Sequence, residues 1–397
     1  MYEEARHEPL IEADWDEERA RAAIDRIVRD THKHFDPQKL WPIHPLDRFR
    51  NDLNVPFKML YFGAAGVIWA LDYLNRIGAT KIERDYSFSM IPFARTNRQD
   101  LNLSPPDTFS YLMGDVGILF VRWRLTPTDA LAHEIFRAVE GNTRNPAREL
   151  MWGAPGTMLA AHFIYELTQD ERWKEVYVRN VRQILSEWEK NAEHGCYVWI
   201  QDLYGQSSIY LGAVHGFAAN IFSIIKGWDL LDASTRSLVE SRASETLERT
   251  ARVDDAYANW PAGLGGTRLL VQHCHGAPGM ITCLADLPSG VNAAFDRLLE
   301  KAGELTWKAG PLTKGPNLCH GTAGNGYALL KLYRRTGDNK WLERARAFAM
   351  HAIEQSERHA KDYGQLRYSL WTGDLGLAVY LWDCIQTEAK FPTMDIF

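Results

Sequence analysis

Apolar residues gather in seven short runs along the chain, and each run begins at a Gly-x-x-Gly unit. Clear examples are "HGTAGNGYALLKLY" at Gly321 and "TGDLGLAVYLWD" at Gly373, whereas the fourth copy has Ala219 at the second glycine position. The copies recur every 39 to 63 residues, which predicts a repeat architecture. The first glycines of the seven units are Gly63, Gly114, Gly153, Gly216, Gly276, Gly321 and Gly373.

The segments between these runs have a different pattern, with apolar residues on one helical face only. In residues 171–190 this face consists of Trp173, Tyr177, Val181, Ile184, Leu185 and Trp188. In residues 340–355 it consists of Leu342, Ala345, Phe348, Ala349, Ala352 and Ile353. Asp338 is the expected N-cap of the second helix. The runs after the glycines are instead apolar nearly all round, so they must be buried on most sides.

Alternation of fully buried and one-sided helices predicts an inner ring inside an outer ring. The expected fold is therefore all-α, an α/α-toroid of seven helix pairs in a single domain over residues 1–397. Residues 1–50 are expected to form an N-terminal helical extension, and the repeats to run from about residue 55 to 385. Strand signals are weak, and residues 195–205 are the one candidate for a short hairpin.

Charge and cysteine content narrow the class of protein. The formal net charge is −6 without a basic stripe, which argues against a nucleic-acid or anionic-membrane partner. No uninterrupted apolar run approaches the ~20 residues of a membrane-spanning helix. The acidic N-terminus does not resemble a secretory signal, and five cysteines do not suggest a disulfide framework. We expect a cytoplasmic monomer with reduced thiols.

The two residues before each first glycine carry the candidate chemistry. The outer slot, two residues before the glycine, holds cysteine only in repeats five and six, as Cys274 and Cys319. The inner slot, one residue before it, holds histidine only in repeats four to six, as His215, His275 and His320. Equivalent positions of adjacent repeats in a toroid face each other, so these donors are expected to meet at one mouth of the ring.

Two thiolates and one imidazole can hold a zinc ion and leave a fourth position for a ligand. Cys274, Cys319 and His320 are the expected set for one Zn²⁺ per chain, and His275 is the competing histidine. The ordinary alternative is that a buried cysteine is a small hydrophobe and an inner-ring histidine a hydrogen-bonded core residue. We assign the hydrophobic role to the other three cysteines, Cys196, Cys283 and Cys384.

These motifs resemble the lanthionine synthetase C (LanC) family, and most of all its glutathione-binding LanC-like proteins. The resemblance rests on "CHGAPG" at 274–279 and "KGPNLCHGTAGNGYALLKLY" at 314–333, and extends to "ELMWGAPG", "HGFAAN" and "SLWTGDLGLAVYL". It implies an α/α-toroid and zinc held by Cys274, Cys319 and His320. It also implies zinc activation of a thiol for Michael addition to a dehydroalanine or dehydrobutyrine residue of a peptide or protein, giving a thioether.

The resemblance also assigns roles to three further residues. His215 matches the family histidine that protonates the enolate or polarises the acceptor carbonyl, and Glu149 would orient it or relay a proton. Lys314 matches the lysine beside the bound thiol, where it would hold a glutathione carboxylate or stabilise the enolate. The ordinary alternatives are a core histidine, a carboxylate at a helix end and a solvated loop lysine.

Departures from the family pattern separate its branches. Leu270 replaces an arginine of the peptide cyclases and His275 replaces their tyrosine, which favours the LanC-like branch over lanthipeptide cyclisation. His273 stands where that branch has tryptophan, and it is a third histidine beside the site. The N-terminal arginine that helps bind glutathione in some relatives cannot be aligned, and Arg6 is available for that role.

The sequence is compatible with three functions. The first is an enzyme that joins a thiol, with glutathione favoured, to a dehydrated residue, and a cyclase of lanthipeptides is a variant of it. The second is a protein that binds zinc and glutathione without turnover. The third, from fold analogy alone, is a carbohydrate enzyme that uses carboxylates such as Asp115 and Asp374.

Overall fold

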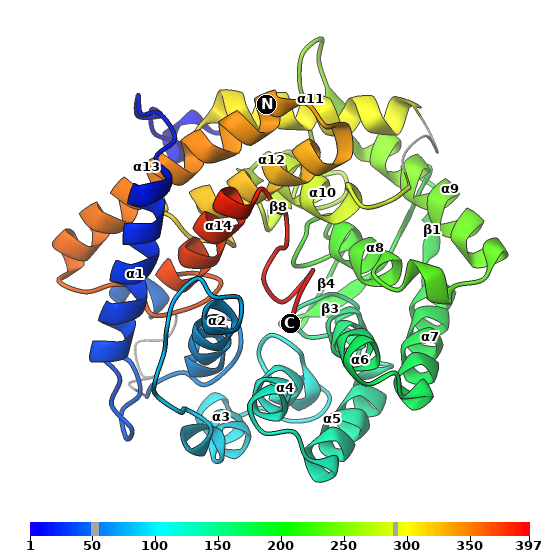
Figure 1. The fold of residues 1–397 in the computed structure, drawn as a ribbon. Coiled ribbons are helices and arrows are strands. Elements are labelled where there is room, and N and C mark those ends of the chain that lie inside the picture. Colours follow the sequence, from blue (N-terminus) through cyan, green and yellow to red (C-terminus); the bar gives the residue numbers. More distant parts are fainter. Residues whose placement is uncertain (49–54, 289–292) are drawn as a thin grey trace.

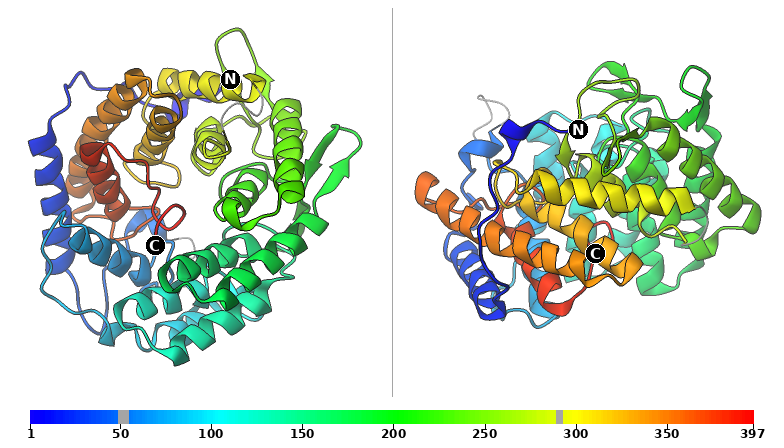
Figure 2. Two further views of the ribbon diagram at one scale, coloured as in Figure 1. Left: turned by 45° about the vertical axis from the view of Figure 1, so that its right-hand side comes forward. Right: turned by 90° about the horizontal axis from the view of Figure 1, so that it is seen from above.

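The helices of the protein form two concentric rings, as the ribbon in Figure 1 and the turned views in Figure 2 show. The structure is a computed structural model that describes residues 1–48, 55–288 and 293–397. Fourteen α-helices lie in this described part, so the predicted toroid of seven helix pairs is confirmed. The last two residues of the predicted 1–50 extension lie outside the described residues.

Each inner helix begins directly after the first glycine of a repeat, which occupies its N-cap position. In α14, eleven of thirteen residues are buried, as the all-round apolar pattern predicts. The inner helices are α2 (Ala64–Arg76), α4 (Asp115–Leu125), α6 (Ala154–Thr168), α8 (Phe217–Ile225), α10 (Ala277–Leu284), α12 (Thr322–Thr336) and α14 (Asp374–Gln386).

The outer helices bury one face, as predicted. All six apolar residues expected in 340–355 are buried, and the Asp338 side chain accepts a hydrogen bond from the backbone N–H of Lys340 at 3.0 Å. In α7, Leu185 is only partly buried, and Trp188 is buried just beyond the helix end. The outer helices are α1 (Glu17–Lys33), α3 (Phe93–Leu101), α5 (Asp129–Asn142), α7 (Glu171–Ser186), α9 (Ala233–Thr250), α11 (Ala293–Ala309) and α13 (Asn339–Tyr363).

The seventh pair is completed by the N-terminus of the chain. No helix follows α14, and its outer partner is α1, which packs against α14 and α13. Asp16 caps α1 by accepting a hydrogen bond from the backbone N–H of Arg19, and the buried face of the helix includes Ile24 and Ile27. The N-terminal segment is therefore one of the seven outer elements of the ring.

The strands of the described chain are short and lie in the loops. β1 pairs with β2 and β3 with β4, so the segment predicted as one hairpin contributes to two. The strands are β1 (Glu189–Asn191), β2 (Cys196–Val198), β3 (Gln201–Leu203), β4 (Gln206–Ser208), β5 (Arg252–Val253), β6 (Ala258–Asn259), β7 (Val271–Gln272) and β8 (His275–Gly276). None of the helices described here is long and apolar enough to cross a membrane.

The loops that precede the inner helices are tied together by a ladder of backbone hydrogen bonds. An N–H at or next to the outer slot of one repeat donates to the corresponding carbonyl of the next, over distances of 2.9–3.4 Å. The donor–acceptor pairs are Ala213–Cys274, Cys274–Cys319, Cys319–Trp371, Trp371–Tyr61, Tyr61–Leu112 and Leu112–Met151. The ladder therefore places the outer-slot residues of adjacent repeats next to each other. Cys274 and Cys319 are one of these adjacent pairs.

The last residues of the chain fill the middle of the ring. The C-terminus lies at the centre of Figure 1, where the Phe397 ring stacks on Phe120 with centroids 3.8 Å apart. The Thr393 hydroxyl accepts a hydrogen bond from Trp371 Nε1 at 3.0 Å. The tail is therefore part of the core beneath the loops.

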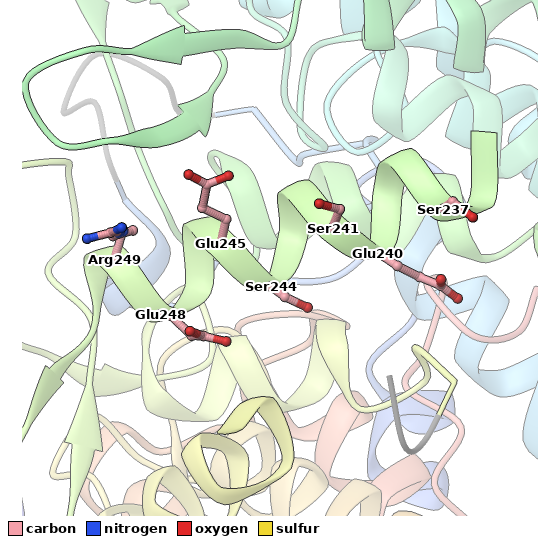
Figure 3. Close-up of a pocket in the computed structure, with 7 residues that line it drawn as sticks. All are labelled: Ser237, Glu240, Ser241, Ser244, Glu245, Glu248 and Arg249. Atoms are coloured by element: carbon pink, nitrogen blue, oxygen red, sulfur yellow. The ribbon is translucent and has the colours of Figure 1, made fainter. Parts of the chain in front are cut away.

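The outside of the ring carries a hollow of about 710 Å³ along α9 (Figure 3). All of its lining side chains come from this one helix, so it is an open, solvated face without an opposing wall. The lining residues are Ser237, Glu240, Ser241, Ser244, Glu245, Glu248 and Arg249.

Candidate functional site

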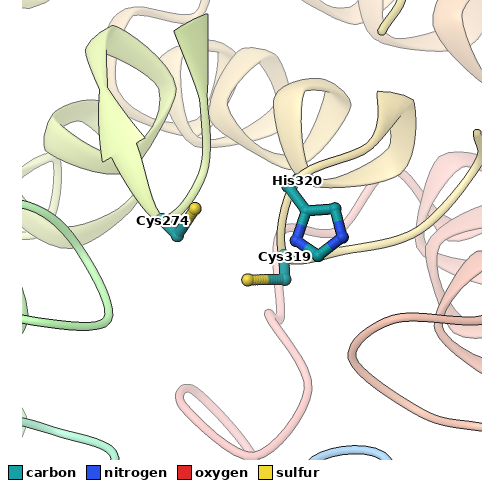
Figure 4. Close-up of side chains that lie close together, drawn as sticks. All are labelled: Cys274, Cys319 and His320. Atoms are coloured by element: carbon teal, nitrogen blue, oxygen red, sulfur yellow. The ribbon is translucent and has the colours of Figure 1, made fainter. Parts of the chain in front are cut away.

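Two thiols and one imidazole converge at one mouth of the ring (Figure 4). One possible ligand atom from each of Cys274, Cys319 and His320 lies within 4.8 Å of the others. The side chains come from the loops before α10 and α12, which the ladder places next to each other. Two sulfurs and one nitrogen in this arrangement suit a structural or catalytic zinc ion.

The local chain geometry explains why the two thiols meet. Cys274 lies in the tight turn between β7 and β8, where Gln272 pairs with His275. Its backbone N–H donates to the carbonyl of Cys319 at 3.0 Å. The backbone at Leu318, which precedes Cys319, lies close to Gly324 of α12. A Cβ atom at Gly324 would lie 1.8 Å from the Leu318 carbonyl oxygen. A glycine at this position therefore permits the approach that brings Cys319 beside Cys274.

The two thiols have different environments. The pKa of Cys274 is lowered, because its thiolate accepts hydrogen bonds from the Cys319 thiol and from Gln272, and these outweigh the cost of burial. Gln272 Nε2 lies 2.8 Å from Cys274 Sγ, while Arg6 Nη2 donates to Gln272 Oε1 at 2.7 Å. The pKa of Cys319 is raised, first because it donates to the Cys274 sulfur and then because it is buried. Cys274 is therefore the more readily ionised of the two thiols.

The three histidines of the neighbourhood differ in their contacts. The His320 ring makes no hydrogen bond to any described residue, and burial and nearby cations lower its pKa to about 3, so it is a neutral potential ligand. His273 is fully buried and stacks on Phe391 with centroids 4.3 Å apart. His275 lies 5.8 Å from the Tyr210 ring, centroid to centroid. Neither His273 nor His275 belongs to a metal-donor group among the described residues.

His215 and Glu149 form a close pair on the same mouth. His215 Nδ1 lies 2.7 Å from Glu149 Oε2, and the carboxylate also accepts the backbone N–H groups of Met151 and Trp152 at 3.0 and 2.6 Å. Burial lowers the pKa of His215, but the charge and hydrogen bond of Glu149 and the Cys274 thiolate outweigh it, so the net pKa is raised. With Nδ1 held by Glu149, Nε2 is the ring nitrogen left for a substrate.

A cleft of about 530 Å³ connects these groups. His215, His320 and Lys314 line it, whereas the predicted residues Cys274, Cys319 and Glu149 are not among its described lining residues. Arg367 and Asp47 line it as well, and the Arg367 guanidinium is bound to both carboxylate oxygens of Asp47 at 2.5 and 2.9 Å. The remaining described lining residues are Leu46, Tyr61, Phe62, Leu101, Leu103, Met113, Met151, Trp152, Tyr204 and Thr372.

Several residues of the site had no signal in the repeat pattern. Arg367, Asp47 and Tyr204 lie outside the slots, and Gln272 became recognisable only through its hydrogen bond to Cys274. The other cysteines behave as the sequence predicts: all three are buried, and burial raises the pKa of each thiol. They are Cys196, Cys283 and Cys384.

The carboxylates of the carbohydrate-enzyme alternative have structural partners. Asp374 is buried and accepts hydrogen bonds from Ser356 Oγ at 2.6 Å and from the Arg367 backbone N–H at 2.8 Å. Asp115 is buried at the start of α4, with Arg98 3.6 Å away. Neither is among the described residues that line the cleft.

Comparison with known proteins decides the family. Residues 57–396 match the family described as lanthionine synthetase C-like protein. The chain belongs to the LanC-like family. A solved nisin cyclase has the same fold with a TM-score of 0.62 and 15% identity, covering 93% of this chain and 94% of that one.

Two curated LanC-like relatives are similar over part of the chain. "Glutathione S-transferase LANCL1" from Danio rerio is 31% identical over 271 residues, or 65% of this chain and 64% of that protein. "LanC-like protein GCL1" from Arabidopsis thaliana is 38% identical over 146 residues, or 35% of this chain and 33% of that protein. The matched regions thus span less than two thirds of either relative.

Proposed function

We propose that the protein is a zinc-dependent enzyme that adds a thiol, with glutathione as the favoured donor, to dehydroalanine or dehydrobutyrine in a peptide or protein. The observation that carries this proposal is the convergence of Cys274, Cys319 and His320 beside a cleft that also contains His215. A LanC-like relative named as a glutathione S-transferase supports a glutathione substrate. The expected product is a thioether.

Cys274, Cys319 and His320 would hold one zinc ion per chain. The fit rests on the donor set, because two buried sulfurs lie beside the His320 ring, which makes no hydrogen bond to any described residue, and thiolate and imidazole are ligands that zinc prefers. When bound, zinc keeps a coordinated thiol deprotonated at neutral pH.

His215 supplies the proton that the addition requires. The donor sulfur forms a bond to the β-carbon of the acceptor, the C=C electron pair moves toward the α-carbon, and His215 Nε2 delivers a proton there. Glu149 holds the ring by Nδ1 and stabilises its protonated form. The proton that the thiol lost returns to His215 through solvent, so the sum of thiol and alkene gives the thioether.

A cation of the cleft binds the anionic donor. Lys314 lines the same cleft as His320, and its charge suits a carboxylate of glutathione, whereas the nearby Arg367 already pairs with Asp47. Lys314 also stabilises negative charge that develops on the acceptor carbonyl. We extend the proposal to a single-domain, monomeric, cytoplasmic protein without a nucleic-acid partner.

Mass spectrometry of a dehydroalanine peptide incubated with glutathione and the zinc-loaded protein tests this function. We expect a gain of one glutathione that is lost with Cys319→Ala. No gain, together with calorimetric binding of glutathione, would instead support the non-catalytic alternative. A peptide that also contains cysteine tests the cyclase: ring closure without glutathione removes its alkylatable thiol at unchanged mass.

A further inference from the structure

The turn between β3 and β4 carries an aromatic residue in an unusual conformation. β3 and β4 are joined by Tyr204 and Gly205 alone, and both have positive φ, +56° and +74°. A two-residue hairpin turn of this kind favours asparagine followed by glycine, because few side chains tolerate the left-handed region. Tyrosine at the first turn position therefore adopts a backbone conformation that it disfavours, and such strained residues are often found at functional sites.

Tyr204 is also exposed although it is large and mostly apolar. Its side chain is 73% accessible, while its hydroxyl accepts a hydrogen bond from Trp152 Nε1 at 3.1 Å. The ring lies edge-on to the His215 ring, with centroids 6.3 Å apart. An exposed aromatic that is held in place beside the proton donor is suited to bind a ligand at low entropic cost.

The cleft has two chemically different walls. The cationic wall consists of Lys314, His320 and Arg367, from the loops before α12 and α14, together with Asp47, which pairs with Arg367 and leaves the wall with a net positive charge. Across the ring in Figure 1, the end of α3, the loops before α4 and α6 and the β3–β4 turn contribute a second wall, whose described lining side chains carry no charge. This apolar wall consists of Leu101, Leu103, Met113, Met151, Trp152 and Tyr204.

We propose that the apolar wall binds the acceptor segment through uncharged, apolar side chains that flank the dehydrated residue, with Tyr204 as the main anchor. This inference rests on the proposed function and names its acceptor class. The cationic wall attracts the carboxylates of the thiol donor, whereas the apolar wall offers nothing to a charged group. An acceptor that contacts Tyr204 lies beside His215.

Equilibrium binding tests the proposal without requiring turnover. Two fluorescently labelled peptides are compared by anisotropy, each with alanine in place of the dehydrated residue, flanked by leucines in one and by aspartates in the other. We expect wild type to bind the leucine peptide about tenfold more tightly, and Tyr204→Asn to lose most of this preference. The matched control is Phe88→Asn, since Phe88 is 79% exposed and does not line the cleft; it should keep the preference.

Thermal unfolding separates binding from a structural role. Tyr204→Asn creates the favoured Asn-Gly turn, so its Tm should equal or exceed that of wild type. Equal affinity of wild type for both peptides, an unaltered preference in Tyr204→Asn or a lowered Tm of this variant would each overturn the proposal. If the protein prefers the leucine peptide but forms no thioether, the proposed function is wrong and the proposed peptide-binding site is still supported. If it forms the thioether but shows no preference, the proposed function is supported and the proposed peptide-binding site is wrong.

Discussion

The Nδ1 atom of His215 lies 2.7 Å from Oε2 of Glu149, a carboxylate whose side chain is fully buried. The contact joins two consecutive repeats, because Glu149 precedes α6 and His215 precedes α8. It fixes which ring nitrogen faces the cleft and raises the pKa of the imidazole. The pair thus favours the protonated form of the His215 imidazole.

The pH dependence of thioether formation should follow this pair. In the proposed mechanism His215 acts in its protonated form, so kcat/KM should fall as pH rises through its raised pKa. Glu149→Gln removes the negative charge, so this alkaline limb should move to lower pH, and His215→Gln should lower kcat by roughly 100-fold. Rates measured across the pH range check both, and an alkaline limb at the same pH in Glu149→Gln would show that another group controls it.

The same pair should make folding stability depend on pH. A folded-state pKa above the unfolded value gives stability that is fully present below about pH 6.5 and is lost as pH rises through the folded pKa. Urea unfolding of wild type and His215→Gln at several pH values measures the difference. The gap in unfolding free energy should narrow as the medium becomes alkaline, and a gap that widens would contradict the assignment.

Zinc content should depend on Cys274 and Cys319 but not on the other buried cysteines. Wild type should hold about one equivalent per chain, and Cys274→Ala should hold little, because a site that loses one thiolate ligand binds zinc far more weakly. Cys283→Ala is the matched control, since its thiol is buried and its pKa is raised well above the ordinary value. Metal analysis of purified protein decides, and equal zinc in both variants would remove the basis of the proposed chemistry.

Gly324→Ala should damage both the fold and the metal site. Its methyl group would meet the Leu318 carbonyl oxygen at 1.8 Å, so the loop that carries Cys319 must shift, at a cost of about 1–3 kcal/mol or more. Gly364→Ala is the control: that glycine, unlike Gly324, has a positive φ of +70°, but it has no heavy atom within 4 Å, so we expect a cost of only about 1 kcal/mol. Unfolding free energies and zinc affinity should separate the variants.

Lys331 should be essential to the stability of the inner ring. It is fully buried on α12, and its ammonium lies 2.7 Å from carboxylate oxygens of both Asp286 and Asp395. Lys331→Met leaves two carboxylates without this cation and should cost about 3–5 kcal/mol. Adding Asp395→Asn should recover part of the loss, because it removes one of the unpaired charges. Denaturant unfolding of the single and double variants checks this, and strict additivity would mean that the two residues do not interact.

The slot pattern predicts the part of the site that depends on repetition. Cys274 and Cys319 occupy the same place in neighbouring repeats, so ring closure alone brings them together. The sequence favours His320 and leaves His275 as the competitor, because both have the same relation to a cysteine; the side-chain positions show that His320 is the one grouped with both sulfurs. The assignment of the metal ligands itself stays a prediction until an ion is measured.

Other features depend on single long-range contacts that no periodicity encodes. Helix α1 appears in the sequence as an extension, but it closes the outer ring against α14. Arg367 reaches Asp47 across more than 300 residues of sequence, and the C-terminal tail fills the ring centre with Phe397. Tyr204 has a positive φ that tyrosine disfavours. The role of such residues can be recognised only from the folded structure.

The backbone ladder around the mouth has one seam in the described chain. It runs from Ala213 through both cysteines to Met151, but the Met151 N–H donates to the Glu149 carboxylate and not to the fourth repeat. The third and fourth repeats are joined there by the His215–Glu149 pair and by Asn220 Nδ2, which donates to the Arg148 carbonyl oxygen at 2.9 Å. Both cysteine loops therefore belong to one continuous arc of backbone hydrogen bonds, whereas His215 lies where that arc is interrupted.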